Sequence, residues 1–303
     1  MPPDGAVAAV VAVAEFVILA GSFVAANAIA CFTIGVLATK VNPRPSTLFF
    51  VPNLIGYIRL GAVLAMLSLH VRGDAFGAAL CYAACATLDG FDGYYARKLG
   101  QCSKFGEALD VAADNAARAA LWVLAACELR GHGAHGCAAL CAVPIALEYT
   151  CAACTHAPSY AAMTADVNWK DPSAALGEAM PWLLQRIFAN GFKNPLGATA
   201  IGGLFFLPFL VYVHCAVTLD GSKFPGSALP AVFTADAGGL PASPAAGDVA
   251  RWAAALPAST VALGVWLVAG RALCAAAEVW LVGKHARVLL ATDRADAARK
   301  KAP

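Results

Sequence analysis

Four aspartates occupy regularly spaced positions in two neighbouring stretches of the chain. Asp89 and Asp92 belong to the first stretch, and Asp110 and Asp114 to the second, within LDGFDGYYARKLGQCSKFGEALDVAADNAAR. Spacings of three and four residues place side chains on one face of a helix. The link between the two stretches is short, which predicts antiparallel neighbouring helices. We therefore expect the four carboxylates to converge.

Unpaired carboxylates in a low-dielectric site repel one another, and divalent cations relieve that repulsion. Ligand sets made only of oxygen favour Mg²⁺, Mn²⁺ or Ca²⁺, and two such ions form a clamp for phosphoryl chemistry. Gly93 and Ala96 continue the face of the first two aspartates. Small residues there would admit a flat group, although close helix packing explains them as well. Arg97 suits either a pyrophosphate or a counter-charge for the carboxylates.

The elements that carry these residues are expected to be membrane helices. Hydrophobic residues make up 60% of the 303-residue chain and charged residues 13%, whereas soluble domains have about 45–50% and 25%. A net charge of +2 without a basic stripe argues against nucleic acid as a partner. Apolar runs long enough to cross a bilayer lie at 16–38, 54–72, 76–98, 105–129, 137–156, 196–219 and 252–283.

This pattern predicts an all-α integral membrane protein. Residues 1–45 form an N-terminal extension with a retained transmembrane helix, for which a signal peptide is the alternative. Residues 46–301 form the membrane domain, and residues 220–250, rich in Gly, Pro and Ser, form a flexible non-cytosolic loop. Within the connection at 157–195, Ala174–Ala189 is expected to be an interfacial helix.

Most of the 21 Lys and Arg residues fall on the side of the membrane that holds the aspartates. The positive-inside rule then places the aspartates at the cytosolic face. The final residues, KKAP, have the form of a dilysine retrieval signal, which favours the endoplasmic reticulum.

The full spacing is Asp89-x2-Asp92-Gly93-x2-Ala96-Arg97-x8-Gly106-x3-Asp110-x3-Asp114. It resembles the signature of the CDP-alcohol phosphotransferase family. The resemblance implies a six-helix membrane bundle that works as a homodimer. It also implies transfer of a phosphoalcohol group from a CDP-linked donor to a hydroxyl acceptor, with release of CMP.

The resemblance also assigns roles to individual residues. Two Mg²⁺ or Mn²⁺ ions are expected, one held by Asp89, Asp92 and Asp110 and the other by Asp89, Asp110 and Asp114. Asp114 is expected to be the general base on the acceptor hydroxyl. Donor contacts are expected from Gly93 and Ala96 to the cytidine, from Arg97 to the phosphates, and from Ser103.

The segment FFVPNLIGYIRL at 49–60 resembles the opening of the eukaryotic phosphatidylinositol synthases in this family. Asn53 and Arg59 match there and are expected beside the donor. CDP-diacylglycerol and myo-inositol are then the implied substrates. The chain departs from those enzymes at Tyr94, where His is common, and at Asn115, where Arg is common.

Candidate acceptor contacts are basic or acidic residues elsewhere in the chain: Lys104, Arg186, Lys193, Arg118 and Glu148. For Arg186 and Lys193, a positive-inside anchor is the favoured alternative. Arg118 could balance the charge of Asp114 or pair with another helix, and Glu148 could instead be the partner of a basic group. Serine or glycerol 3-phosphate as acceptor, or a CDP-choline or CDP-ethanolamine phosphotransferase, remain alternatives. A cation transporter is a remote one, because its acidic site would lie near the membrane midplane.

Overall fold

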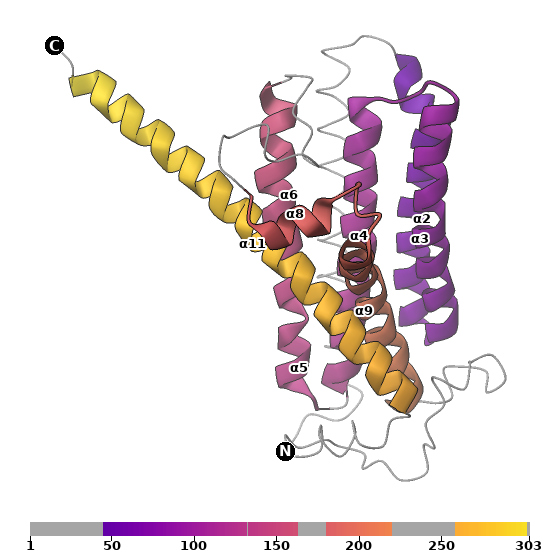
Figure 1. Cartoon of the computed structure of the whole chain (residues 1–303). Coiled ribbons are helices and arrows are strands. Elements are labelled where there is room, and N and C mark those ends of the chain that lie inside the picture. The colour runs from indigo at the N-terminus through magenta and orange to yellow at the C-terminus, as the bar shows by residue number, and fades with distance from the viewer. Residues whose placement is uncertain (1–44, 132, 163–179, 220–257, 302–303) are drawn as a thin grey trace, which may run out of the picture. The chain divides into compact units, whose positions relative to one another are not determined.

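The computed structural model describes residues 45–131, 133–162, 180–219 and 258–301 (Figure 1). These residues form helices and turns and contain no strand, as the sequence predicts. The chain divides into two compact units, residues 1–142 with 208–262 and residues 143–207 with 263–303.

The first unit contains three long antiparallel helices, which lie side by side in Figure 1. After the short 3₁₀ helix η1 (Pro45–Phe49), they are α2 (Val51–Val71), α3 (Ala75–Lys98) and α4 (Lys104–Gly131). Pro52 stands in the first turn of α2, where a missing N–H costs no helical hydrogen bond. Asp74 caps α3 by accepting a hydrogen bond of 2.8 Å from the backbone N–H of Gly77.

The core of the first unit forms where α2, α3 and α4 meet the second half of α9 (Pro195–Leu219). Met66, Ala78, Leu121 and Tyr212 come from these four helices and are fully buried. The alanines of α3 and α4 allow helices to approach closely, and α2 packs against both α3 and α4.

The second unit is built from α6 (Ala142–Ala162), α8 (Trp182–Phe188), the first half of α9 and α11 (Ala258–Lys301). Leu184 and Ile187 of α8 are buried in one cluster with residues of α9 and α11. A Cβ on Gly203 would lie 2.2 Å from the backbone nitrogen of Arg271, so glycine is required where α9 crosses α11.

Four of the described helical segments are long and apolar enough to cross a bilayer, Val51–Val71, His135–Thr155, Pro195–Ala216 and Val261–Leu290. They identify an integral membrane protein. Helices α3 and α4 are long enough as well, with 24 and 28 residues, but they carry the charged residues of the motif. Each span predicted after residue 50 therefore coincides with a long helix, with one interruption.

The interruption divides the span predicted at 137–156 into α5 (His135–Leu140) and α6. Pro144 has no N–H to donate to the carbonyl of Leu140, and this accounts for the break. Within the predicted interfacial helix, Trp182–Phe188 is helical, and its place at the membrane interface stays a prediction. The predicted span at 16–38, residues 174–179 and the predicted loop at 220–250 lie outside the described residues.

Candidate active site

The four aspartates lie on two helices joined by a tight turn. Helix α3 carries Asp89 and Asp92 in its last turns, and α4 carries Asp110 and Asp114. Between the helices, Gly100 adopts a left-handed φ of +64°, which glycine tolerates without strain.

The aspartates converge as the sequence predicts. Oxygen atoms of Asp89, Asp92 and Asp110 lie within 4.8 Å of one another, a spacing that suits a metal ion. Asp114 lies one turn after Asp110 and contacts the same arginine as the other three. The donor set consists only of carboxylate oxygens, so the site fits a hard divalent cation such as Mg²⁺ or Mn²⁺.

Arg59 of α2 lies at the centre of this cluster. Its Nη1 atom donates hydrogen bonds of 2.7 Å to Asp92 Oδ2 and of 2.7 Å to Asp110 Oδ1. Its Nη2 atom lies 3.1 Å from Asp89 Oδ1 and also donates to Asp114 Oδ1. Arg59 is fully buried, at 0% exposure, and Asp92 is buried too, so water screens this pair little, whereas Asp89 and Asp110 are partly exposed to solvent.

Arg118 is a second cation at the cluster and contacts Asp114. Its Nη1 donates to Asp114 Oδ2 at 3.1 Å and its Nη2 donates to Asn115 Oδ1 at 2.7 Å. The two oxygens of Asp114 are therefore held by different arginines, Oδ1 by Arg59 of α2 and Oδ2 by Arg118 of α4 itself. Asn115, one of the two departures noted from the sequence, accepts the hydrogen bond from Nη2 of Arg118.

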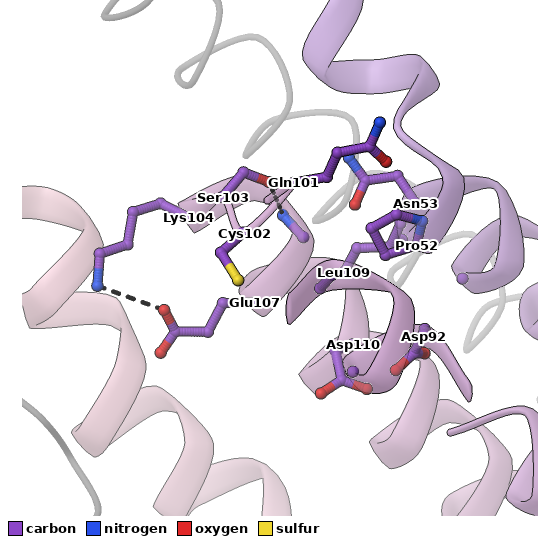
Figure 2. Close-up of a pocket in the computed structure, with 14 residues that line it drawn as sticks. Pro52, Asn53, Asp92, Gln101, Cys102, Ser103, Lys104, Glu107, Leu109 and Asp110 are labelled. Carbon is purple, nitrogen blue, oxygen red and sulfur yellow. Dashed lines mark hydrogen bonds and ion pairs between the residues drawn. The ribbon is translucent and has the colours of Figure 1, made fainter. Parts of the chain in front are cut away.

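A pocket of about 430 Å³ opens beside Asp92 and Asp110 (Figure 2). Most of the residues predicted to bind the donor line it, together with residues of the turn before α4. The lining comprises Pro52, Asn53, Gly56, Asp92, Gly93, Ala96, Gln101, Cys102, Ser103, Lys104, Gly106, Glu107, Leu109 and Asp110. In Figure 2, the ion pair of Lys104 with Glu107 (3.3 Å) lies on the side of the pocket away from the two aspartates.

Small residues shape this pocket. Gly106 lies against the side chains of Asn53 and Ser103, and a Cβ at Gly106 would be 2.8 Å from Asn53 Oδ1 and 3.1 Å from Ser103 Oγ. Ser103 Oγ accepts a hydrogen bond of 3.0 Å from the backbone N–H of Gly106 and so caps α4. The terminal nitrogens of Arg97 lie over Gly93.

The side-chain amide of Asn53 is hydrogen-bonded through its nitrogen, whereas its oxygen has no hydrogen-bond partner among the described residues. Its Nδ2 donates to the carbonyl of Thr47 at 2.5 Å. Its Oδ1 is buried and accepts no hydrogen bond from the described residues. Gln101 lines the same pocket. Its Oε1 accepts a hydrogen bond of 2.9 Å from the backbone N–H of Val51 at the start of α2. The Oδ1 of Asn53 is therefore an acceptor oxygen available to a ligand in this pocket.

Three candidate acceptor residues belong to the second unit. Arg186 and Lys193 are exposed. Glu148 is buried and lies 3.4 Å from Arg271, which also donates to Glu278 at 2.9 Å. In the described residues, Glu148 therefore has the basic partner that the sequence offered as an alternative to acceptor binding.

Gln101 and Glu278 are among the polar residues that were not singled out from the sequence. Gln101 carries no sequence signal, because its contact with Val51 joins residues 50 positions apart. Glu278 carries one, because it lies seven residues after Arg271 in an otherwise apolar run and thus on the same helical face.

Comparison with known proteins adds a family assignment. The family model described as CDP-alcohol phosphatidyltransferase matches residues 49–217, more than half of the chain. The chain is 40% identical over 77 residues to the CDP-diacylglycerol–inositol 3-phosphatidyltransferase of Schizosaccharomyces pombe, which is 25% of this chain and 32% of the relative. It is 40% identical over 82 residues to that of Rattus norvegicus, 27% of this chain and 38% of the relative.

A plant relative, CDP-diacylglycerol–inositol 3-phosphatidyltransferase 1 of Arabidopsis thaliana, is 33% identical over 92 residues, 29% of this chain and 40% of the relative. The chain thus spans well under half the length of these curated relatives. No solved structure matches the chain.

Proposed function

The chain belongs to the CDP-alcohol phosphatidyltransferase family, and on that premise we propose that it transfers a phosphatidyl group from CDP-diacylglycerol to myo-inositol. The products are phosphatidylinositol and CMP. The printed names of the relatives support the choice of substrates.

The observation that carries the proposal is the convergence of four aspartates beside a pocket lined by small residues. Asp89, Asp92 and Asp110 would hold one divalent ion, and Asp89, Asp110 and Asp114 a second. Bound there, Mg²⁺ or Mn²⁺ would neutralise charge on the diphosphate and on departing CMP.

The pocket supplies a place for the nucleotide. Gly93 and Ala96 leave room for the cytidine against α3, and Asp92 and Asp110 line the end of the pocket nearest the aspartate cluster. The basic groups of Arg59 and Arg97 flank this region and match the charge of a diphosphate. The acyl chains of the donor can remain in the bilayer while its head group enters.

Asp114 is the proposed general base. The acceptor hydroxyl has a pKa far above 7, so attack on phosphorus needs a base within hydrogen-bond reach. In the proposed reaction the hydroxyl oxygen bonds to the phosphatidyl phosphorus and its proton passes to Asp114. The bond from that phosphorus to the oxygen of CMP breaks, and CMP leaves with the electron pair.

Arg118 fixes Asp114 from one side, at 3.1 Å, and is therefore a positioning residue in this scheme. Lys104, Arg186, Lys193 and Glu148 remain proposed contacts for the acceptor. We further propose a homodimer in the membrane of the endoplasmic reticulum with the active site facing the cytosol. The excess of basic residues on that side supports this orientation.

The test is CMP release by the purified full-length chain in detergent with CDP-diacylglycerol and Mg²⁺ or Mn²⁺. Acceptors are offered singly: myo-inositol, serine and glycerol 3-phosphate. Release that depends on inositol supports the proposal. CMP release with serine or glycerol 3-phosphate, but not with myo-inositol, would support the proposed reaction type and refute myo-inositol as the acceptor. Turnover of CDP-choline or CDP-ethanolamine with diacylglycerol would reject the donor.

A further inference from the structure

Arg59 contacts all four aspartates of the candidate metal site. We propose that Arg59 competes with divalent ions for these carboxylates, and that ion binding transfers its guanidinium to the diphosphate of the donor. The inference rests on the proposed function, because it takes the diphosphate as the second partner of Arg59. It assigns to one side chain the coupling between ion binding and donor binding.

The contacts of Arg59 place its nitrogens where the carboxylates converge. Nη1 lies 2.7 Å from both Asp92 Oδ2 and Asp110 Oδ1, and Nη2 lies 3.1 Å from Asp89 Oδ1. These aspartates are the ones whose oxygens gather within 4.8 Å. A Mg²⁺ ion needs oxygens at about 2.0–2.1 Å. An ion that takes oxygens from several of these side chains must therefore lie in the space of the terminal nitrogens.

Charge leads to the same conclusion. One guanidinium offsets only part of the charge of four carboxylates, whereas two divalent ions neutralise them fully. Arg59 would then be a buried cation without a counter-charge, which is unfavourable in a low-dielectric site. A diphosphate group restores the balance, because it carries the negative charge that the neutralised aspartates no longer supply.

Arg59 lies close to the pocket in which the diphosphate is proposed to bind. Asp92 and Asp110 bond to Arg59 and also line the pocket. Gly56, one turn before Arg59 on α2, lines the pocket too. The Nε of Arg59 is buried and donates to none of the described residues, so a donor on this side chain is available for a new acceptor. A guanidinium is well suited to phosphate oxygens.

Arg118 provides a contrast. It donates to Asp114 and Asn115, and an ion bound between Asp89, Asp92 and Asp110 would leave these two hydrogen bonds in place. Arg59, in contrast, contacts each of the four aspartates.

The experiment measures Mn²⁺ binding in detergent without nucleotide, from the electron paramagnetic resonance signal of free Mn²⁺. The full-length chain, Arg59→Leu, Arg59→Lys and the control Arg72→Gln are compared. Arg72 is exposed at the C-terminal end of α2, beyond the residues that contact the aspartates or line the pocket. We expect Arg59→Leu to bind Mn²⁺ at least about ten-fold more tightly than wild type, a typical size for coupling between two ligands. Arg59→Lys should fall between them, and Arg72→Gln should match wild type.

A second measurement adds CDP without acceptor. In wild type, CDP should tighten Mn²⁺ binding strongly, because it offers Arg59 its second partner. In Arg59→Leu this additional tightening should fall by about ten-fold or more. The proposal would be overturned if Arg59→Leu bound Mn²⁺ no more tightly than wild type, or if Arg72→Gln bound Mn²⁺ as tightly as Arg59→Leu. It would also be overturned if CDP tightened Mn²⁺ binding by Arg59→Leu as much as by wild type.

Protein folding is followed separately through the melting temperature with EDTA and with Mn²⁺. Arg59→Leu should melt lower than wild type in EDTA and recover with Mn²⁺. If Arg59→Leu does not fold, Arg59→Lys decides the question. These readouts need no turnover, so an altered acceptor would refute the proposed function and leave this result standing. Absence of Mn²⁺ binding in every variant would overturn both.

Discussion

The substitution Gly106→Ala tests whether the pocket beside the aspartates binds the nucleotide. The added Cβ would lie 2.8 Å from Asn53 Oδ1 and 3.1 Å from Ser103 Oγ, closer than such atoms normally pack. Asn53 cannot turn away freely, because its Nδ2 is bonded to the carbonyl of Thr47 at 2.5 Å. Both neighbours line the pocket and would be displaced, so its shape must change.

The expected effect follows from the cost of overpacking. Inserting a methyl into a packed site costs about 1–3 kcal/mol. If the nucleotide must restore the original shape, this cost weakens CDP binding by about 5- to 150-fold. Isothermal titration calorimetry with CDP and Mn²⁺ measures the affinity, and the melting temperature confirms that the variant is folded.

Gly61→Ala is the matched control. Gly61 lies on α2 with no heavy atom within 4 Å of the added Cβ, so CDP affinity should equal that of wild type. A folded Gly106→Ala variant that binds CDP within two-fold of wild type would refute the assignment of the pocket. Equal weakening by both substitutions would refute the steric argument.

Three further substitutions test the base, the helix crossing and the buried ion pairs. Asp114→Asn should lower inositol-dependent CMP release by about 10²–10⁴-fold with CDP affinity little changed; wild-type turnover would remove Asp114 as the base. Gly203→Ala should lower the melting temperature by several degrees, because its Cβ would lie 2.2 Å from the backbone nitrogen of Arg271; an unchanged melting temperature would contradict the close crossing. Arg271→Leu should destabilise the protein by about 3–5 kcal/mol, because it removes the cation from the buried carboxylate of Glu148 and the half-buried carboxylate of Glu278. Glu148→Gln should destabilise the protein less than Arg271→Leu, since the 2.9 Å hydrogen bond from Arg271 to Glu278 remains. Equal losses of stability in the two variants, measured by thermal unfolding, would contradict a central role of Arg271 in these ion pairs.

The long helices could be predicted because apolar runs of bilayer length leave few alternatives. The predicted span 54–72 corresponds to α2 at 51–71, and 76–98 corresponds to α3 at 75–98. The convergence of the aspartates could be predicted for a similar reason. Spacings of three and four residues fix a helical face, and a short turn fixes the partner helix. The break between α5 and α6 has a signal in Pro144, which a hydropathy pattern alone does not capture.

The position of Arg59 could not be predicted. A matching motif placed it near the donor, whereas the structure places its guanidinium among carboxylates 30 to 55 residues away in sequence. Which of several partners a long side chain takes depends on its rotamer and on the packing of three helices. The same holds for Gln101 and Val51, whose hydrogen bond joins a turn to the start of another helix. Local sequence determines which helices form, and tertiary packing determines these contacts.

The most direct test of the central claim is the stoichiometry of the proposed reaction. Full-length protein in detergent is given CDP-diacylglycerol, Mn²⁺ and radiolabelled myo-inositol, and the label in extracted lipid is measured together with CMP. The proposed function predicts one mole of labelled phospholipid for each mole of CMP, and neither product when CDP-diacylglycerol or Mn²⁺ is omitted. CMP formation without label in lipid, at the same rate with and without inositol, would contradict it.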